Sequence, residues 1–414
     1  MALIVSVAMG LGMTACGGGT VGFMWVIGTQ YNQIAGLKID NYTGNLTEMP
    51  HQPFISGGAT PVSLVVKPGG RYLYVVNQGG ATSTVTTTGP QQCTTGGVAE
   101  FSIGGDGILT FQQCFQTQGI KPVWAAMSTG GDFLYVLDQQ APTAVCGTGA
   151  TPTSCFGAIT VFSVADDTGR LTLVTNQQVK NSDGTQLTYF PVGNTPIMMK
   201  VAGGGCLFTL DSGDQTVFPY TIGAAGQLTL PTNTTISIGP NRRLTSINVG
   251  GSYVYLTDAA ATTDSPGGYI LPYTVGTGCA LNTVTGGQIA NLPQTSNPVN
   301  TMVSNNSKYL YVLNQSTTNS NAPAYSSISA FTIASTGLLQ PVADQFNPYP
   351  VGAGPTCMVE DPTNQYVYTS NYMDGTVTGK NLDDRSGQLS NLRRGATFTA
   401  TGLATCLAVS GNVN

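Results

Sequence analysis

The segment Tyr72-Leu73-Tyr74-Val75-Val76-Asn77 follows a Gly-Gly turn and ends in a side-chain amide. Its alternating residues are typical of a β-strand, and the glycines supply the backbone angles of a tight turn. Similar segments recur along the chain. The seven copies are Met24-Trp25-Val26-Ile27-Gly28, Tyr72-Leu73-Tyr74-Val75-Val76-Asn77, Phe133-Leu134-Tyr135-Val136-Leu137-Asp138, Leu207-Phe208-Thr209-Leu210-Asp211, Tyr253-Val254-Tyr255-Leu256-Thr257-Asp258, Tyr309-Leu310-Tyr311-Val312-Leu313-Asn314 and Tyr366-Val367-Tyr368-Thr369-Ser370-Asn371.

Each copy belongs to a larger repeat. A strand precedes it, and a third strand, a Gly turn and a fourth strand follow it, as in Val98–Ile103 and Ile108–Phe111. Four strands in each period of about 50–70 residues are typical of propeller blades, because radial repetition leaves no long open sheet edge. The sequence therefore predicts an all-β, seven-bladed β-propeller of four-stranded antiparallel blades over residues 23–414.

The two ends of the repeat are complementary. The chain begins with a second strand, Gly22–Gly28, and ends with a first strand, Thr405–Ser410. We therefore expect the C-terminal strand to become the innermost strand of the N-terminal blade and to close the ring.

The composition limits the function. Only 8% of the residues are charged, against about a quarter in an average soluble chain. The net charge is −5, and the 14 basic residues are dispersed. A nucleic-acid-binding surface needs clustered Lys and Arg, so we expect no nucleic-acid partner.

The first residues are typical of a targeting segment. An apolar run, Ala2–Met13, precedes Thr14-Ala15-Cys16 and is shorter than the roughly 20 residues that span a bilayer. This pattern resembles a bacterial lipoprotein signal with Cys16 as the lipidated residue, although no basic residue precedes Lys38. The alternatives are an ordinary cleaved signal or an apolar tail. We expect residues 1–16 to be the signal, residues 17–22 a short linker, and the protein to be exported to the cell envelope or outside the cell.

The remaining eight cysteines suit an exported protein. An even number, no Cys-x-x-Cys pair and a single histidine favour disulfides over a metal site. Alternate turns of a four-stranded blade lie on the same face of the propeller. Assigning each cysteine to its strand or turn in the repeat predicts four pairs. They are Cys93–Cys114, Cys146–Cys155, Cys206–Cys279 and Cys357–Cys406.

Several segments together resemble one known family. Trp25–Tyr31, Ile34–Asp40, Thr43–Thr47 and Val66–Asn77 are similar to the opening blades of the seven-bladed lactonase propellers, which include 6-phosphogluconolactonase, and to YVTN-type surface propellers. The resemblance covers residues 23–414. It implies the propeller fold and, for lactonase relatives, a site on one face of the central channel. It is a weak indication of function, because propellers carry many unrelated activities.

The resemblance also suggests positions for a site. Asn194–Lys200 lacks the histidines of the relatives, Asp211 matches an Asp, and Gly239-Pro240-Asn241-Arg242-Arg243 keeps a guanidinium while lacking a histidine. Asp258 stands where the relatives have Glu. Lactone hydrolysis needs a base and an oxyanion partner, so the candidate catalytic residues are Arg242, Arg243, Asp211 and Asp258.

A structural role at turns is the alternative to a catalytic role for Asp211 and Asp258. The residues that end six of the seven second strands are all Asn or Asp, and a residue that recurs in every blade is more typical of a turn cap than of a catalyst. They are Asn77, Asp138, Asp211, Asp258, Asn314 and Asn371.

Other polar positions have similar alternatives. Glu360-Asp361 is more typical of a turn than of a cation site. His51 is expected in an exposed link after the first blade, and Gly203-Gly204-Gly205 is expected to form a hairpin turn. Trp25 and Trp124 lie in predicted strands and are expected in the core.

Two functions remain open. The first is a non-catalytic envelope propeller that binds its ligand through long polar loops at residues 78–97, 139–157 and 315–327. The second is a lactonase-like hydrolase acting on a sugar lactone or related ester. We expect a monomer that binds a small molecule, glycan or protein at its loop face or channel mouth. We expect no cofactor and no metal, and membrane contact only through a lipid anchor.

Overall fold

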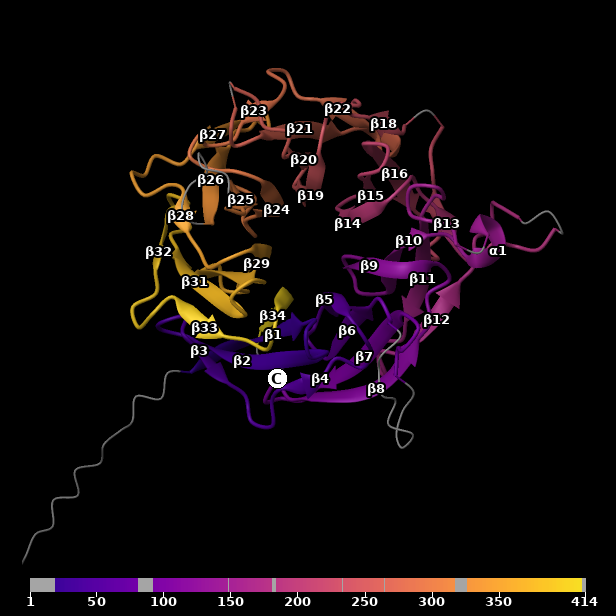
Figure 1. Cartoon of the computed structure of the whole chain (residues 1–414), viewed down its shortest axis with the longest axis horizontal. Helices are drawn as coiled ribbons and strands as arrows, with labels where there is room; N and C mark the ends of the chain where they lie inside the picture. The colour runs from indigo at the N-terminus through magenta and orange to yellow at the C-terminus, as the bar shows by residue number, and fades with distance from the viewer. Residues whose placement is uncertain are drawn as a thin grey trace, which may run out of the picture.

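The strands form seven antiparallel sheets around a central axis, and the predicted seven-bladed β-propeller is confirmed (Figure 1). The computed structural model describes residues 19–80, 92–147, 149–180, 184–232, 234–263, 265–316 and 326–411. The predicted signal segment with Cys16, and parts of all three predicted polar loops, lie outside these residues.

The blades follow one another in chain order. The first contains β1 (Thr20–Gly28), β2 (Gln33–Asp40), β3 (Leu46–Glu48), β4 (Phe54–Ile55) and the C-terminal β34 (Ala404–Gly411). The second contains β5 (Pro61–Val66), β6 (Tyr72–Asn77), β7 (Gly97–Ile103) and β8 (Leu109–Phe115). The third contains β9 (Ile120–Met127), β10 (Phe133–Gln140), β11 (Ala158–Val164), β12 (Leu171–Val174) and β13 (Phe190–Pro191), with α1 (Thr143–Cys146) between β10 and β11.

The remaining four blades repeat this order. The fourth blade contains β14 (Pro196–Ala202), β15 (Cys206–Asp211), β16 (Thr216–Ile222), β17 (Leu228–Thr229) and β18 (Ile236–Ser237). The fifth contains β19 (Leu244–Gly250), β20 (Tyr253–Asp258), β21 (Tyr269–Val275), the 3₁₀ turn η1 (Thr277–Cys279), β22 (Leu281–Thr283) and β23 (Ile289–Ala290). The sixth contains β24 (Pro298–Val303), β25 (Tyr309–Asn314), β26 (Ser327–Ile333), β27 (Leu339–Pro341) and β28 (Tyr349–Pro350), and the seventh contains β29 (Pro355–Glu360), β30 (Tyr366–Asn371), β31 (Thr376–Leu382), β32 (Leu389–Asn391) and β33 (Thr397–Thr399).

The repeated aromatic residues of the second strands join neighbouring blades. The hydroxyl of Tyr311 donates a hydrogen bond of 3.0 Å to the carbonyl of Gly387, which lies in a turn of the next blade. The same glycine has no room for a side chain, because the ring of Tyr309 covers it. The Tyr-x-Tyr pattern therefore encodes packing between blades as well as strands. Equivalent bonds run from Tyr74 to Gly169, from Tyr255 to Gly337 and from Tyr368 to Gly44.

The C-terminal strand closes the ring as expected. β34 pairs antiparallel with β1, from Gly22 opposite Gly411 to Gly28 opposite Ala404, and lies beside it in Figure 1. The predicted linker at residues 17–22 is partly wrong, because β1 already begins at Thr20. The carbonyl of Ser410 approaches Gly22 too closely for any side chain there. The glycine that resembled a linker is therefore a strand residue at a crowded position.

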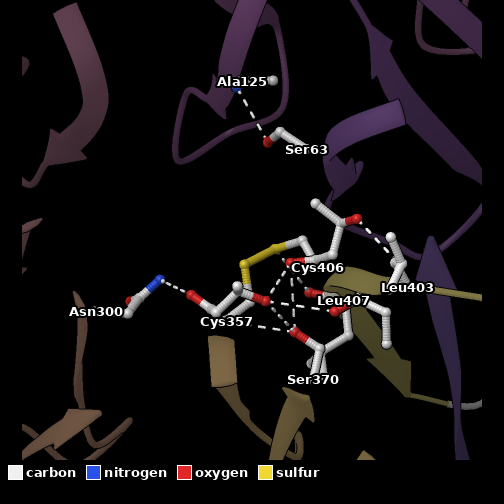
Figure 2. Close-up of a disulfide and its surroundings, with 11 residues drawn as sticks. Ser63, Ala125, Asn300, Cys357, Ser370, Leu403, Cys406 and Leu407 are labelled. Atoms are coloured by element: carbon white, nitrogen blue, oxygen red, sulfur yellow. Dashed lines mark hydrogen bonds between the residues drawn. A yellow bond between two sulfur atoms is a disulfide. The ribbon is translucent and has the colours of Figure 1, made fainter. Parts of the chain in front are cut away.

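Four disulfides join the pairs that the blade map predicted. Their Cα–Cα distances are 5.4 Å for Cys93–Cys114, 5.7 Å for Cys146–Cys155, 5.6 Å for Cys206–Cys279 and 5.0 Å for Cys357–Cys406. The last bridge joins the innermost strands of the final and first blades, β29 and β34 (Figure 2). It therefore locks the ring closure covalently.

The disulfides differ in the length of chain they enclose, which predicts different contributions to stability. Cys206 and Cys279 are 73 residues apart, whereas Cys146 and Cys155 are 9 apart. In the chain-entropy account, removing the first bridge costs about 4 kcal/mol and removing the second about 2.5 kcal/mol. We expect Cys206→Ser/Cys279→Ser to lower the midpoint of urea unfolding more than Cys146→Ser/Cys155→Ser. Equal midpoints for the two double variants would contradict this account.

No helix in the described ranges is both long enough and apolar enough to span a membrane.

Candidate functional site

The Asn residues that end the second strands of the sixth and seventh blades join strands within those blades. Asn314 is 1% exposed and donates hydrogen bonds to the carbonyls of Val312 and Ser327 and to the hydroxyl of Ser329. Asn371 donates bonds of 2.9 Å to both Thr376 and Thr378. These contacts join the second strand to the third, so the recurring position has a structural role in these blades.

Asp211 lies at this position in the fourth blade. It is fully buried, and its Oδ2 accepts a 2.9 Å bond from the hydroxyl of Thr209. Its Oδ1 has no hydrogen-bond partner. Burial raises the pKa of this carboxyl well above its ordinary value. A raised pKa suits a catalytic base, but no part of this side chain is exposed to receive a substrate.

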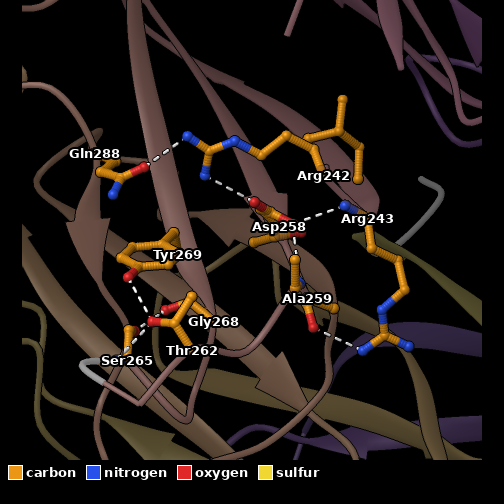
Figure 3. Close-up of polar contacts among 12 residues, drawn as sticks. Arg242, Arg243, Asp258, Ala259, Thr262, Ser265, Gly268, Tyr269 and Gln288 are labelled. Carbon is orange, nitrogen blue, oxygen red and sulfur yellow. Dashed lines mark hydrogen bonds and ion pairs between the residues drawn. The ribbon is translucent and has the colours of Figure 1, made fainter. Parts of the chain in front are cut away.

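Asp258 has a different set of partners (Figure 3). Its Oδ2 lies 2.9 Å from Nη1 of Arg242, and its Oδ1 accepts bonds of 2.8 and 2.9 Å from the backbone N–H groups of Arg243 and Ala260. Asp258 is fully buried, whereas the side chain of Arg242 is 29% exposed. The carboxylate therefore fixes the link that leads into β19, and Arg242 balances its charge.

The two arginines are also held by other groups. Nη2 of Arg242 donates a 2.7 Å bond to Gln288, and its guanidinium lies 5.9 Å from the ring centre of Tyr269. Nη2 of Arg243 donates a 2.7 Å bond to the carbonyl of Ala259. Arg242 also borders a crevice of about 160 Å³ formed with Gln288 and residues of β21. The guanidinium of Arg242 is thus directed toward the outer part of its blade.

The structure brings together only part of the predicted catalytic set. Arg242, Arg243 and Asp258 share one network, whereas the carboxylate of Asp211 is bonded within the neighbouring blade. Both carboxylates are inaccessible. A catalytic role for these four residues stays a prediction, and their contacts in this conformation are structural.

The other polar positions form turns and links. Asp361 accepts hydrogen bonds from the backbone N–H groups of Thr363, Gln365 and Tyr366, as a turn cap does. His51 is exposed and has a positive φ of 62°. Within the parts of the chain that the structure describes, no three His, Cys, Asp or Glu residues are close enough to hold a metal ion.

A cavity of about 470 Å³ lies along the axis of the ring. Residues from all seven innermost strands, β5, β9, β14, β19, β24, β29 and β34, line it. Its size is within the range of about 300–1,000 Å³ that is usual for small-molecule sites. Its walls combine apolar side chains with polar ones, and its charged lining residues are Lys200 and Glu360.

Lys200 of β14 contributes the cation. Its Nζ lies 5.6 Å from the ring centre of Trp124, which belongs to the neighbouring strand β9. Burial lowers the pKa of Lys200 to about 8. The expectation that Trp124 is a core residue is only partly right, since this half-buried ring also lines the cavity. Trp25, in contrast, is fully buried.

Glu360, the last residue of β29, contributes the anion. It is 8% exposed, and its Oε2 accepts a 2.7 Å bond from the backbone N–H of Asn305. Its Oε1 is buried without a hydrogen-bond partner. Burial is the main cause that raises the pKa of Glu360 to about 7, and the neighbouring Asp361 adds to it. Near neutral pH this carboxyl can therefore either accept or donate a proton.

Sequence reasoning did not assign this pair. Lys200 lies in the segment Asn194–Lys200, where the lactonase relatives have histidines, and Glu360 precedes Asp361 at a position typical of a turn. The available signal was a charge at inner-strand positions that are apolar in most other blades. Only the closed ring shows that both residues border one cavity.

Comparison with known proteins supports the fold assignment. The model of the family described as "Lactonase, 7-bladed beta-propeller" matches residues 20–147 and 268–405. A search of curated proteins found no match. Because the family model covers more than half of the chain, it establishes family membership.

Several solved structures share the architecture. The periplasmic gluconolactonase of Pseudomonas aeruginosa is 18% identical, with a TM-score of 0.66 over 95% of this chain and 100% of that one. A candidate 6-phosphogluconolactonase of Bacteroides fragilis is 17% identical, with a TM-score of 0.67 over 94% of this chain and 98% of that one. A protein of Lactobacillus plantarum is 16% identical, with a TM-score of 0.68 over 95% and 100% of the two chains.

At this level of identity the neighbours establish the fold alone. Together with the seven closed blades and the family match, they show that the chain belongs to the seven-bladed β-propeller lactonase family.

Proposed function

We propose that this protein is an exported ligand-binding propeller that holds a small polar molecule in its central cavity. The observation that carries the proposal is the presence of two charged side chains, Lys200 and Glu360, on the walls of a 470 Å³ cavity. Burying such groups costs free energy, which a bound ligand of complementary polarity would offset.

Export is supported by two independent features. The four disulfides are typical of proteins that fold in an oxidising compartment. One structural neighbour is a periplasmic gluconolactonase. Attachment through a lipid on Cys16 is part of the proposal. It would be tested by mass spectrometry of the mature N-terminus and by replacing Cys16 with Ser, which should release the protein from membranes.

The alternative function is a lactonase-like hydrolase that opens a sugar lactone or a related ester. Family membership favours it, and a carboxyl with a pKa near 7 in the cavity is suitable for a general base. The residues carried over from the family favour binding without catalysis, because Asp211 and Asp258 are fully buried.

A panel of aldonolactones and their open-chain acids separates the two functions. We expect a saturable rise in melting temperature with at least one small polar compound and no lactone turnover above the rate in buffer. Arg242→Ala/Arg243→Ala should then leave ligand binding unchanged while lowering stability. Turnover by the wild-type protein that disappears in the double variant would instead establish hydrolysis at the inherited positions. If no compound of this panel and no small zwitterion binds, the proposal of a cavity ligand is wrong.

A further inference from the structure

The two charges of the cavity lack ionic partners. The salt bridges in the described part of the chain are Lys67–Asp166 and Arg242–Asp258, and neither involves Lys200 or Glu360. The ammonium of half-buried Lys200 lies over the ring of Trp124, and one oxygen of Glu360 is buried without a hydrogen-bond partner. Desolvated groups of this kind are costly unless something else satisfies them.

The strand register places the Cα atoms of Lys200 and Glu360 at nearly the same height along the axis. Lys200 pairs with Phe208, three residues before Asp211, and Glu360 pairs with Val367, four residues before Asn371. Asp211 and Asn371 hold the same position in their blades. The two Cα atoms therefore differ in height by one residue, about 3.3 Å. From there the side chain of Lys200 reaches toward Trp124 of β9, and that of Glu360 toward the backbone of Asn305, beyond the end of β24.

Around the ring, the two charges lie on distant walls. β14 packs against β19, β19 against β24, and β24 against β29, so two blades separate the strand of Lys200 from the strand of Glu360. The return path runs through β34, β5 and β9, which present Val409, Val66 and Met127 to the cavity. On this side of the ring an apolar zone therefore lies between the cation and the anion, whereas the shorter side through β19 and β24 presents Asn248, Asn300 and Thr301.

A ligand that carries one negative and one positive charge would be complementary to Lys200 and Glu360. We propose that the central cavity binds a small zwitterion whose carboxylate pairs with Lys200, whose ammonium pairs with Glu360, and whose apolar spacer lies between them. The inference rests on the proposed binding function and specifies its ligand class. Ion pairs and charge-assisted hydrogen bonds are worth most where water is excluded, so both ends of such a ligand contribute to its affinity.

The neighbouring amides are already used by the fold and do not compete for this role. Nδ2 of Asn300 donates a 3.0 Å bond to the carbonyl of Thr356, and Nδ2 of Asn248 donates to the carbonyl of Thr301. These bonds join adjacent inner strands. The charge pair is thus the part of the lining whose bonding capacity remains open.

Calorimetric titration with matched probes tests the inference. ε-Aminocaproate carries both charges, caproate only the carboxylate and n-hexylamine only the ammonium. We expect ε-aminocaproate to bind about tenfold or more tightly than either single-charge probe. Glycine and γ-aminobutyrate, titrated in parallel, define the spacing between the charges.

Two cavity variants identify the contacts. Lys200→Met should remove the advantage of ε-aminocaproate over n-hexylamine, and Glu360→Gln should remove its advantage over caproate. Glu360→Gln keeps an oxygen that can accept the N–H of Asn305. Lys308→Met and Glu48→Gln, which change exposed residues outside the cavity, serve as controls and should bind like the wild type.

The outcomes separate this inference from the proposed function. If the zwitterions bind no better than the single-charge probes, or if the cavity variants keep the wild-type order of affinities, the ligand class is wrong. Binding of neutral sugars or lactones alone would leave the proposed function intact and overturn the zwitterion. If neither panel binds, both proposals fail.

Discussion

A chain that ends at Gly402 should lose the cooperative unfolding transition of the wild-type protein. The truncation removes β34, which pairs with β1 and packs against both β5 and β29. It also exposes the first blade to solvent along its inner edge and deletes one half of the Cys357–Cys406 bridge.

The expected effect is as large as the stability of a typical domain. The bridge encloses 49 residues and contributes about 4 kcal/mol by chain entropy. Burial of a residue such as Leu407, which is 3% exposed, contributes about 1.5–3 kcal/mol more. Since domains are stable by about 5–15 kcal/mol, little stability remains.

Differential scanning calorimetry of three chains checks this prediction. A chain that ends at Gly411 is the control and should melt like the full-length protein. Cys357→Ser/Cys406→Ser retains the strand without the bridge and should melt between the two. An unchanged melting temperature for the Gly402 chain would exclude a stabilising role for the closure.

The same substitution at one repeated position should have opposite effects in two blades. Asp211→Asn should stabilise the protein at neutral pH, whereas Asp258→Asn should destabilise it. Both residues are fully buried and end a second strand, but only Asp258 has a cationic partner, Arg242. The sign of the effect depends on that partner.

The seventh blade shows why an amide suits position 211. Oδ1 of Asn371 accepts a bond from Thr369, and its amide group donates to two threonines of the next strand. Asp211 likewise accepts from Thr209, while its second oxygen is unpaired. At position 258, in contrast, an amide group would face the guanidinium of Arg242, donor against donor, at a cost of about 1–3 kcal/mol.

Urea unfolding across a pH series measures both effects. Burial raises the pKa of folded Asp211 above its ordinary value, so the wild type loses stability as the pH rises from about 4 toward the folded pKa. The advantage of Asp211→Asn should therefore be small near pH 4 and grow with pH. Asp138, whose pKa is raised to about 7, should add to the same trend between about pH 4 and pH 7. A parallel response of the two variants would refute the assigned roles.

The candidate site was only partly predictable. The sequence indicated Arg242 and Asp258, which form a salt bridge. The family resemblance suggested a catalytic role for them, whereas the structure shows that they fix the link that leads into β19. Trp124 was expected in the core because its strand is apolar, and it lines the cavity because its strand is the innermost of a blade.

The sequence by itself determined the seven repeats and the four main strands of each blade, and it predicted the pairing of the cysteines that the structure shows. These properties depend on local signals: alternation with a period of two, glycines at tight turns, and a repeat that gives every residue a place in its blade. The Tyr-x-Tyr segments with which the sequence analysis began also fixed the packing between blades, since their hydroxyls bond to the glycine turns of the next blade.

The tertiary structure alone decided the placement of the charges. Lys200 and Glu360 are 160 residues apart in the chain by their numbering and share a cavity only because the ring closes. Asp211 and Asp258 are equivalent in the repeat, yet one is unpaired and the other bound to arginine. The energy of a buried charge depends on which groups surround it in space, and a local pattern does not contain that information.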